Sequence, residues 1–411
     1  MHASPYRRDL ALLTFCQAMF FMANTIIVST APLIGFMYAP TTVLATLPTG
    51  LQFLATMAAT VPASYTMKYI GRRSGLALGA TFGVGGGLLG FFAIMAGNFV
   101  MFCAATMTYG VFMAFAQYYR FAAADAADAA VDEGNRRLNG ERLRGRAISI
   151  VMAGGIVAAI LGPELAKATR DLFAPILFAG SYLAVAALAA VSVFTLTFIT
   201  LRRAHSGFSG GSVRPLSELM RQPGIATAVF SAVVGYITMT LLMTATPIAM
   251  AACGHEFSDS AWVIQWHVFG MFAPSFFTGA LIAKRGAEQV ILFGIMAIGA
   301  AIAVNLSGID VWQFTAGLFL LGIGWNFMFV GGTTLLTRCY RPSEKAKVQG
   351  CNDFIVFTTL AVAATSAGAL HDILGWQVMN LLAVPGLLLV LGLLWSSHSG
   401  RSPRALSEVS P

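Results

Sequence analysis

Residues 43–96 decide the fold of this chain: VLATLPTGLQFLATMAATVPASYTM (43–67), then KYIGRRS (68–74), then GLALGATFGVGGGLLGFFAIMA (75–96). This stretch consists of two long apolar runs joined by a short basic turn. Each run exceeds the ~20 residues that cross roughly 30 Å of hydrocarbon at about 1.5 Å per residue of helix. The stretch therefore predicts two transmembrane helices with a polar turn between them.

Apolar runs of this kind recur along the whole chain. Twelve can be placed in the 411 residues, at 10–36, 43–67, 75–96, 101–124, 147–168, 174–200, 224–249, 261–283, 288–307, 311–336, 349–370 and 375–396. They predict an all-α polytopic membrane protein with twelve transmembrane helices.

The basic residues lie in alternate gaps between these runs. Most of the 25 Lys and Arg residues lie at the termini or in the gaps after runs two, four, six, eight and ten. The other gaps hold only Lys167 and Arg170, and Arg120 lies inside run four. The positive-inside rule therefore predicts that both termini are cytoplasmic, as an even number of spans requires. The expected location is the bacterial cytoplasmic (inner) membrane.

Composition excludes several classes of protein. The chain is 57% hydrophobic and 10% charged, which leaves no room for a sizeable water-soluble domain. Its net charge of +8 is spread over short loops, so we expect contact with anionic lipid headgroups and no binding of nucleic acid. No closely spaced His and Cys cluster, nucleophile motif or nucleotide-binding loop is present in the sequence. We therefore expect no metal, no cofactor and no enzymatic activity.

The domain organisation follows from the longest polar connection. Residues 1–201 form a first unit of six spans, and residues 224–397 form a second. The linker 202–223 is rich in Gly and Ser and ends in a predicted short amphipathic helix. The tail 398–411 is expected to be disordered. The chain is expected to be a monomer.

The turns after runs two and eight resemble one another. Ser64 and Gly71 have the same spacing as Gly279 and Gly286, which lie 215 residues later. The candidate motif residues of the two loops together are Ser64, Gly71, Arg72, Arg73, Gly279, Lys284 and Gly286. Parallel repeats of six spans are typical of transporters, with the substrate bound between the repeats near the middle of the membrane.

These loops resemble the signature of the major facilitator superfamily, in which a Gly is followed by three residues, an Asp, a basic residue, any residue and Gly-Arg-Arg. The sequence departs from it, since Lys68 and Ala283 replace the two Asp residues. The resemblance implies two pseudo-symmetric six-helix bundles that rock about a central cavity. Run five, with Gly154-Gly155 and Gly162-Pro163, partly matches the antiporter motif of this family.

Charged residues inside membrane spans are functional candidates, because an unpaired charge in lipid costs several kcal/mol. Arg120 and Asp353 lie near the cytoplasmic ends of runs four and eleven. The resemblance implies that these runs close an inner gate, so we expect Arg120 to pair with Asp353 when the carrier faces outward, with Lys68 as the rival partner of Asp353. The alternatives are that Arg120 extends to the interface while Asp353 caps its helix, or that Arg120 contacts an anionic substrate.

A second polar group is expected in the outer half. Runs five and eight adjoin in this family, which brings Glu164 toward Gln265 and His267. A carboxylate or an imidazole in a low-dielectric site can relay protons, so Glu164, His267 and Asp353 are candidates for proton coupling, and Gln265 is a gate candidate. The alternatives are a solvated carboxylate at Glu164 and a histidine satisfied by a neighbouring helix.

Substrate contacts are expected from runs one, four, seven and ten, which line the cavity in the family. Amides and aromatic rings at mid-depth suit a planar ligand with hydrogen-bonding groups. The alternative is hydrogen bonding between helices. The candidates are Asn24, Gln52, Gln117, Tyr236, Trp325 and Asn326.

The sequence thus predicts a secondary transporter that moves a small organic solute by alternating access, with protons and the lipid bilayer as further partners. The partial antiporter motif favours proton-coupled efflux. The alternative is uptake of a planar or anionic nutrient, for example a vitamin such as riboflavin. A second alternative is a membrane sensor or assembly partner of the same fold that transports nothing.

Overall fold

A computed structural model describes residues 5–132, 140–200, 214–215, 218, 224–340 and 344–399. Within these ranges every regular element is a helix, which confirms the predicted all-α class. The linker 202–223 with its predicted helix and the predicted tail 398–411 lie almost entirely outside the described residues.

The helices of the first part of the chain cover most of residues 5–196. They are α1 (Pro5–Tyr38), η1 (Thr42–Leu44), α2 (Leu47–Ile70), α3 (Arg72–Met95), α4 (Phe99–Ala116), α5 (Tyr119–Asp132), α6 (Gly140–Arg170) and α7 (Ala179–Leu196).

The helices of the second part begin after the linker. They are α9 (Ile225–Ala252), α10 (Phe257–Phe272), α11 (Ser275–Arg285), α12 (Ala287–Leu306), α13 (Val311–Thr337), α14 (Lys345–Leu381) and α15 (Val384–Ser399).

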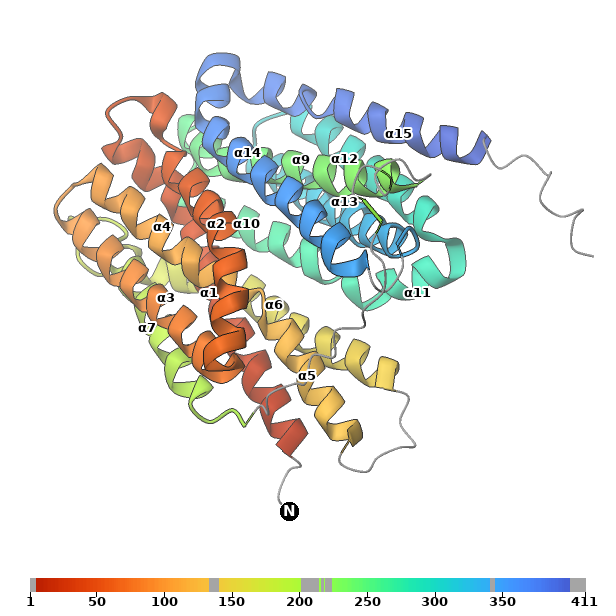
Figure 1. The fold of residues 1–411 in the computed structure, drawn as a ribbon. Helices are drawn as coiled ribbons and strands as arrows, with labels where there is room; N and C mark the ends of the chain where they lie inside the picture. The colour runs from red at the N-terminus through yellow and green to blue at the C-terminus, as the bar shows by residue number, and fades with distance from the viewer. Residues whose placement is uncertain are drawn as a thin grey trace, which may run out of the picture.

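Among the described residues, 11 helical segments are long and apolar enough to cross a membrane. The last, Cys351–Ser396, covers nearly all of the final two predicted runs, 349–370 and 375–396. The backbone leaves helical geometry at Gly375 (φ 73°, ψ 169°), and the chain turns sharply between α14 and α15 (Figure 1). The break in helical geometry therefore coincides with the predicted start of the twelfth run.

Two predicted spans are interrupted. Run four consists of α4 and α5, which are separated at Gln117 and Tyr118, and run eight consists of α10 and α11, which are separated at Ala273 and Pro274. Each run is nevertheless one candidate span by length and hydropathy, Phe99–Ala127 and Phe257–Arg285, as predicted. A proline lacks the backbone N–H that continues a helix, so Pro274 explains the second break. The polar segment 125–146, which the sequence assigns to a loop between runs four and five, is helical over its described residues, 125–132 and 140–146.

The two related turns have the same backbone conformation. Gly71 (φ 88°, ψ 156°) precedes α3, and Gly286 (φ 87°, ψ 157°) precedes α12. A positive φ strains residues that have a Cβ atom, so this turn favours glycine at both positions. The spacing noticed in the sequence thus corresponds to one turn geometry that occurs twice.

The helices pack in two groups. In the first, α1 contacts α5, α6 and α7, while α3 packs between α4 and α7; in the second, α13 contacts α9, α10 and α12. The main contacts between the groups join α2 to α14, α6 to α10 and α1 to α9 (Figure 1). The glycines of α3 serve helix packing, because a Cβ at Gly79, Gly83, Gly86, Gly87 or Gly90 would overlap α4 or α7.

The two groups touch closely at the end of the molecule that holds η1. The Thr46 hydroxyl donates to the Thr365 carbonyl (3.0 Å) and accepts from the Gly368 N–H (2.9 Å). One turn further along α2, a Cβ at Gly50 would overlap Thr365 Oγ1 and would lie 2.8 Å from the Thr365 Cα. Helices α2 and α14 can therefore approach this closely only because residue 50 has no side chain.

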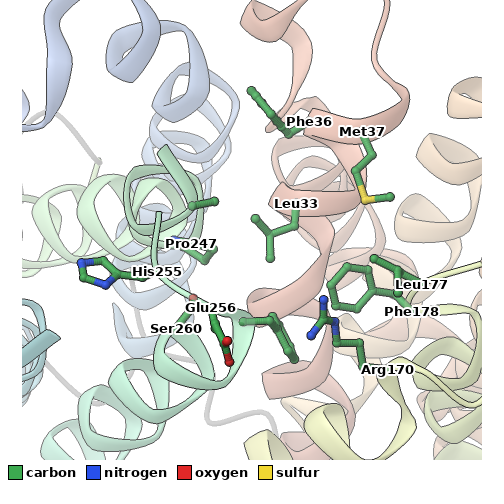
Figure 2. A pocket seen from close by; sticks show the side chains of 12 residues that line it. Leu33, Phe36, Met37, Arg170, Leu177, Phe178, Pro247, His255, Glu256 and Ser260 are labelled. Carbon is green, nitrogen blue, oxygen red and sulfur yellow. The ribbon is translucent and has the colours of Figure 1, made fainter. Parts of the chain in front are cut away.

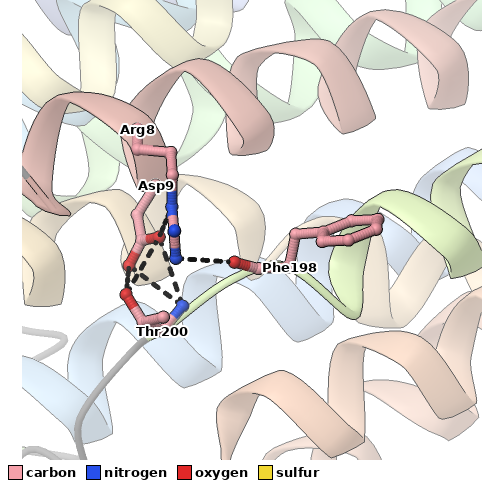
Figure 3. A network of polar contacts seen from close by, with 4 residues as sticks. All are labelled: Arg8, Asp9, Phe198 and Thr200. Atoms are coloured by element: carbon pink, nitrogen blue, oxygen red, sulfur yellow. Dashed lines mark hydrogen bonds and ion pairs between the residues drawn. The ribbon is translucent and has the colours of Figure 1, made fainter. Parts of the chain in front are cut away.

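At the opposite end, a polar network ties the start of α1 to the segment after α7 (Figure 3). Asp9 is buried, and its carboxylate accepts from the N–H and the hydroxyl of Thr200 at 3.0–3.3 Å. Arg8 donates to the Phe198 carbonyl at 2.9 Å. Because these partners belong to one helix group, we assign the network a structural role.

Candidate functional site

An aromatic cluster joins α9 to α13. Trp325 and Phe329, one helical turn apart on α13, have stacked rings (5.3 Å between centroids, 11°). Tyr236 of α9 meets both rings edge-on, at 5.1 Å from Trp325 and 5.0 Å from Phe329. The Trp325 Nε1–H is buried and has no hydrogen-bond partner among the described residues. The cluster thus combines flat aromatic faces with an unused donor.

Two predicted gate residues lie close to this cluster. Arg120 of α5 and Asp353 of α14 both interact electrostatically with Tyr236, and also with each other. They form no ion pair within 4 Å among the described residues. Arg120 Nε is buried without a hydrogen-bond partner, and its guanidinium lies 4.9 Å from the Phe121 ring centroid. The exposed Asp353 carboxylate accepts from Asn352 at 3.3 Å.

The break between α4 and α5 determines where Arg120 lies. Gln117 is half-buried and caps α4, and the Tyr118 hydroxyl donates to the Thr60 carbonyl of α2 at 3.1 Å. Arg120 therefore belongs to the first turn of a new helix. Interrupted helices are common at transporter binding sites, where the freed backbone lines a cavity.

Asn24 and Gln52 form a polar pair between α1 and α2. The Gln52 amide donates to Asn24 Oδ1 at 3.1 Å and lies 3.6 Å from Met113 Sδ. Gln52 is fully buried, and its Oε1 has no hydrogen-bond partner. A buried acceptor without a partner costs about 1–3 kcal/mol, so a bound donor would be favourable here.

Asn326, a predicted substrate contact, has its amide occupied by other helices. Its Nδ2 donates to the Met271 carbonyl and the Ser275 hydroxyl, both at 2.7 Å, and its Oδ1 accepts from Thr278 at 2.8 Å. These bonds hold α13 against the junction of α10 and α11. Asn326 therefore fits the alternative of hydrogen bonding between helices.

The three outer-half candidates do not form one cluster. His267 is fully buried, and its Nδ1–H donates to the Leu318 carbonyl at 2.7 Å, which leaves Nε2 as an acceptor without a partner. Gln265 Oε1 is also buried and lacks a partner. Glu164 is exposed instead and pairs with Lys167 at 2.5 Å, which fits the alternative of a solvated carboxylate.

The loop residues lie at the surface. Ser64, Lys68, Arg73, Gly279 and Lys284 are exposed. Arg72 forms an ion pair with Asp125 of α5, a contact that the sequence did not reveal because Asp125 was assigned to a loop. The Asp of the family's loop motif is replaced here by Lys68. The Arg72–Asp125 ion pair instead connects this turn to α5 of its own helix group.

Phe329 is the site residue that the sequence prediction missed. Its position four residues after Trp325 places both rings on one face of α13, and this spacing was the available signal.

The structure and site define a multi-pass membrane protein with a polar and aromatic interior, and comparisons with known proteins identify its family. The family profile of the Major Facilitator Superfamily matches residues 228–410. The chain is 40% identical over 391 residues, 95% of either chain, to a riboflavin transporter, RfnT, of Brucella anthropi. It is 26% identical over 365 residues to an uncharacterized MFS-type transporter, YddS, of Bacillus subtilis, covering 84% of this chain and 80% of the relative.

A solved structure has the same fold. The human organic anion transporter MFSD10 matches 95% of this chain and 100% of its own, with a TM-score of 0.64 and 14% sequence identity. At that identity the likeness concerns the fold alone. The chain belongs to the major facilitator superfamily, and it is a transporter and not an enzyme.

Proposed function

We propose that this protein is an uptake transporter for riboflavin or a closely related planar vitamin, and that it works by alternating access. The observation that carries the proposal is the full-length similarity to a transporter named for riboflavin. It favours the uptake alternative over the efflux that the partial antiporter motif suggested.

The chemistry of the site supports a ligand of this type. The isoalloxazine ring of riboflavin is flat and aromatic, and its pyrimidine edge carries both hydrogen-bond donors and acceptors. Trp325, Tyr236 and Phe329 offer aromatic faces for stacking. The unpartnered Trp325 Nε1–H and Gln52 Oε1 offer a donor and an acceptor. Arg120 adds a positive charge close to Tyr236.

The transport cycle in this proposal uses the two helix groups as two six-helix bundles. The twelfth span follows if the chain crosses the membrane on each side of Gly375. With both termini in the cytoplasm of a bacterial cell, the end that holds η1 faces outward and is closed by the contacts of Thr46 and Gly50. The protein would then face inward, as a monomer in the cytoplasmic membrane.

Riboflavin binding to the detergent-purified protein tests this proposal. Stacking on a tryptophan quenches flavin fluorescence, so titrating the protein into riboflavin should give saturable quenching. A competitor with the same ring system should displace riboflavin and reverse the quenching. Ligand binding should also raise the unfolding temperature. A protein that retains its fold but gives neither signal would refute riboflavin as the substrate.

The inner gate gives a prediction for Arg120 and Asp353. In the outward-facing state we expect these charges to form an ion pair, so Asp353→Asn should lower uptake about tenfold, in line with couplings of ~1.5 kcal/mol for close charge pairs. The charge-exchanged double variant Arg120→Asp, Asp353→Arg should recover part of the activity. Asp372→Asn, which removes an exposed acid from the same helix, is the control. Unchanged uptake in Asp353→Asn would exclude the gate.

Proton coupling gives a second prediction, for His267. Its buried Nε2 acceptor can take up a proton, so His267→Gln should abolish accumulation driven by an acidic exterior and leave riboflavin exchange intact. Uptake into vesicles with and without an imposed pH gradient measures both. His371→Gln, the same substitution at a half-buried histidine of α14, serves as control. If His267→Gln still responds fully to the gradient, His267 carries no coupled proton.

A further inference from the structure

A pocket separate from the aromatic cluster lies between the two helix groups, at the end that holds η1 (Figure 2). Its volume is about 430 Å³, within the ~300–1,000 Å³ typical of sites for small molecules. The first group contributes the last turn of α1 and the segment between α6 and α7, and the second contributes the end of α9 and the start of α10. The pocket is lined by Leu33, Phe36, Met37, Arg170, Leu177, Phe178, Pro247, Ala251, His255, Glu256, Phe257 and Ser260.

Arg170 is placed to hold an aromatic ligand. Its guanidinium lies 5.9 Å from the Phe178 ring and 5.7 Å from the Phe257 ring, and these rings meet edge-on at 5.0 Å. Its Nε is buried and has no hydrogen-bond partner, and the Asp171 carboxylate lies 3.6 Å from it. Figure 2 shows the guanidinium directed toward the pocket beside Phe178. A planar solute can stack on these groups and accept from Nε.

Ser260 supplies a second unused polar group on the opposite wall. It is only 2% exposed, and its Oγ has no hydrogen-bond partner within the part of the chain that the structure describes. A buried hydroxyl without a partner is costly, so a ligand that binds it recovers free energy. Arg170 and Ser260 come from different helix groups. A ligand that contacts both would therefore bridge the two groups.

The charges in the pocket restrict the ligand. Glu256 also lines it, and its carboxylate caps α10 in a capping box with Asp259. Because Arg170 already pairs with Asp171 and Glu256 lies on the other wall, the pocket has no positive charge that is not balanced by a carboxylate. A neutral solute with hydroxyl groups suits it better than a phosphorylated solute, whose charge Glu256 would repel.

We propose that this pocket is an outer recognition site for the transported solute, a neutral planar ring system with hydroxyl groups such as riboflavin. The inference rests on the proposed function. It adds a second binding site, on the face from which the solute arrives during uptake, built around Arg170 and Ser260. Binding there would precede transfer to the aromatic cluster of Tyr236, Trp325 and Phe329.

Protection of a cysteine in the pocket tests this site. Ala251→Cys, combined with Cys253→Ser, is labelled with maleimide in the detergent-purified protein, and labelling at position 251 is followed by peptide mass. Trp325→Ala is added to weaken the central cluster. Riboflavin should still slow labelling at position 251, whereas its 5′-phosphate should require about tenfold higher concentration.

Variants of the pocket separate the outer site from effects transmitted through the protein. Arg170→Ala should raise the riboflavin concentration needed for protection about tenfold, and Ser260→Ala should raise it by a smaller factor. Lys167→Ala is the matched control, because it removes a positive charge from the same end of α6 but does not line the pocket. Protection should be unchanged in this variant.

The outcomes distinguish the two proposals. If the protein binds riboflavin by fluorescence but labelling at position 251 ignores it, the outer site is refuted and the proposed function stands. Loss of protection with Trp325→Ala and its persistence with Arg170→Ala would likewise overturn the outer site. If riboflavin does not bind at all, the proposed function fails and this inference fails with it.

Discussion

Replacing Trp325 by Ala will reduce riboflavin binding and uptake by about tenfold or more. Trp325 is the centre of the aromatic cluster, stacked on Phe329 and in edge contact with Tyr236. Stacking of a planar heterocycle on an aromatic side chain contributes ~1–3 kcal/mol, which corresponds to about 5- to 150-fold in affinity. Initial rates of radiolabelled riboflavin uptake and the fluorescence titration both measure the loss.

Two further variants show which property of Trp325 matters. Trp325→Phe keeps an aromatic face but removes the Nε1–H, so it should retain more activity than Trp325→Ala. Trp312→Ala changes an exposed tryptophan at the start of the same helix and should have no effect. Wild-type uptake by a folded Trp325→Ala protein would show that the substrate binds elsewhere.

Replacing Gly50 by Leu will reduce uptake by about tenfold or more, without loss of the fold. In this conformation α2 and α14 approach so closely that a Cβ at residue 50 would lie 2.8 Å from the Thr365 Cα, which cannot move aside as a flexible side chain could. Overpacking of this kind costs ~1–3 kcal/mol. The cost applies only to the state in which these helices touch, so the substitution shifts the protein away from that state.

The Gly50 variant needs a control for general destabilisation. Gly299→Leu places the same side chain on α12, where a Cβ meets nothing within 4 Å, and should transport normally. Riboflavin binding by the Gly50→Leu protein should persist, because the aromatic cluster is not touched. A Gly50→Leu protein with normal uptake would mean that the closed end does not need to form during transport.

The sequence predicted the helical membrane class well, because lipid forces the backbone to satisfy its own hydrogen bonds over long apolar runs. It did not predict the break at Gln117 and Tyr118, where neither proline nor glycine marks the interruption. The second break could have been predicted from Pro274. The shared turn at Gly71 and Gly286 was visible as a repeated spacing and has one backbone geometry.

The candidate site was predictable only in part. Tyr236 and Trp325 were chosen for residue type and depth, and the structure places them in contact. Asn326 was chosen for the same reasons, but its amide is occupied by Met271, Ser275 and Thr278. Those partners lie at a junction between two short helices, and one-dimensional periodicity cannot indicate which helices face each other there.

Counterflow of radiolabelled riboflavin tests the central claim most directly. Proteoliposomes preloaded with unlabelled riboflavin need no ion gradient for this exchange, so the result does not depend on the coupling ion. We predict saturable accumulation of label in vesicles with the wild-type protein, and strongly reduced accumulation with Trp325→Ala. Accumulation no greater than in protein-free liposomes, from protein that is folded and incorporated, would contradict the assignment as a riboflavin transporter.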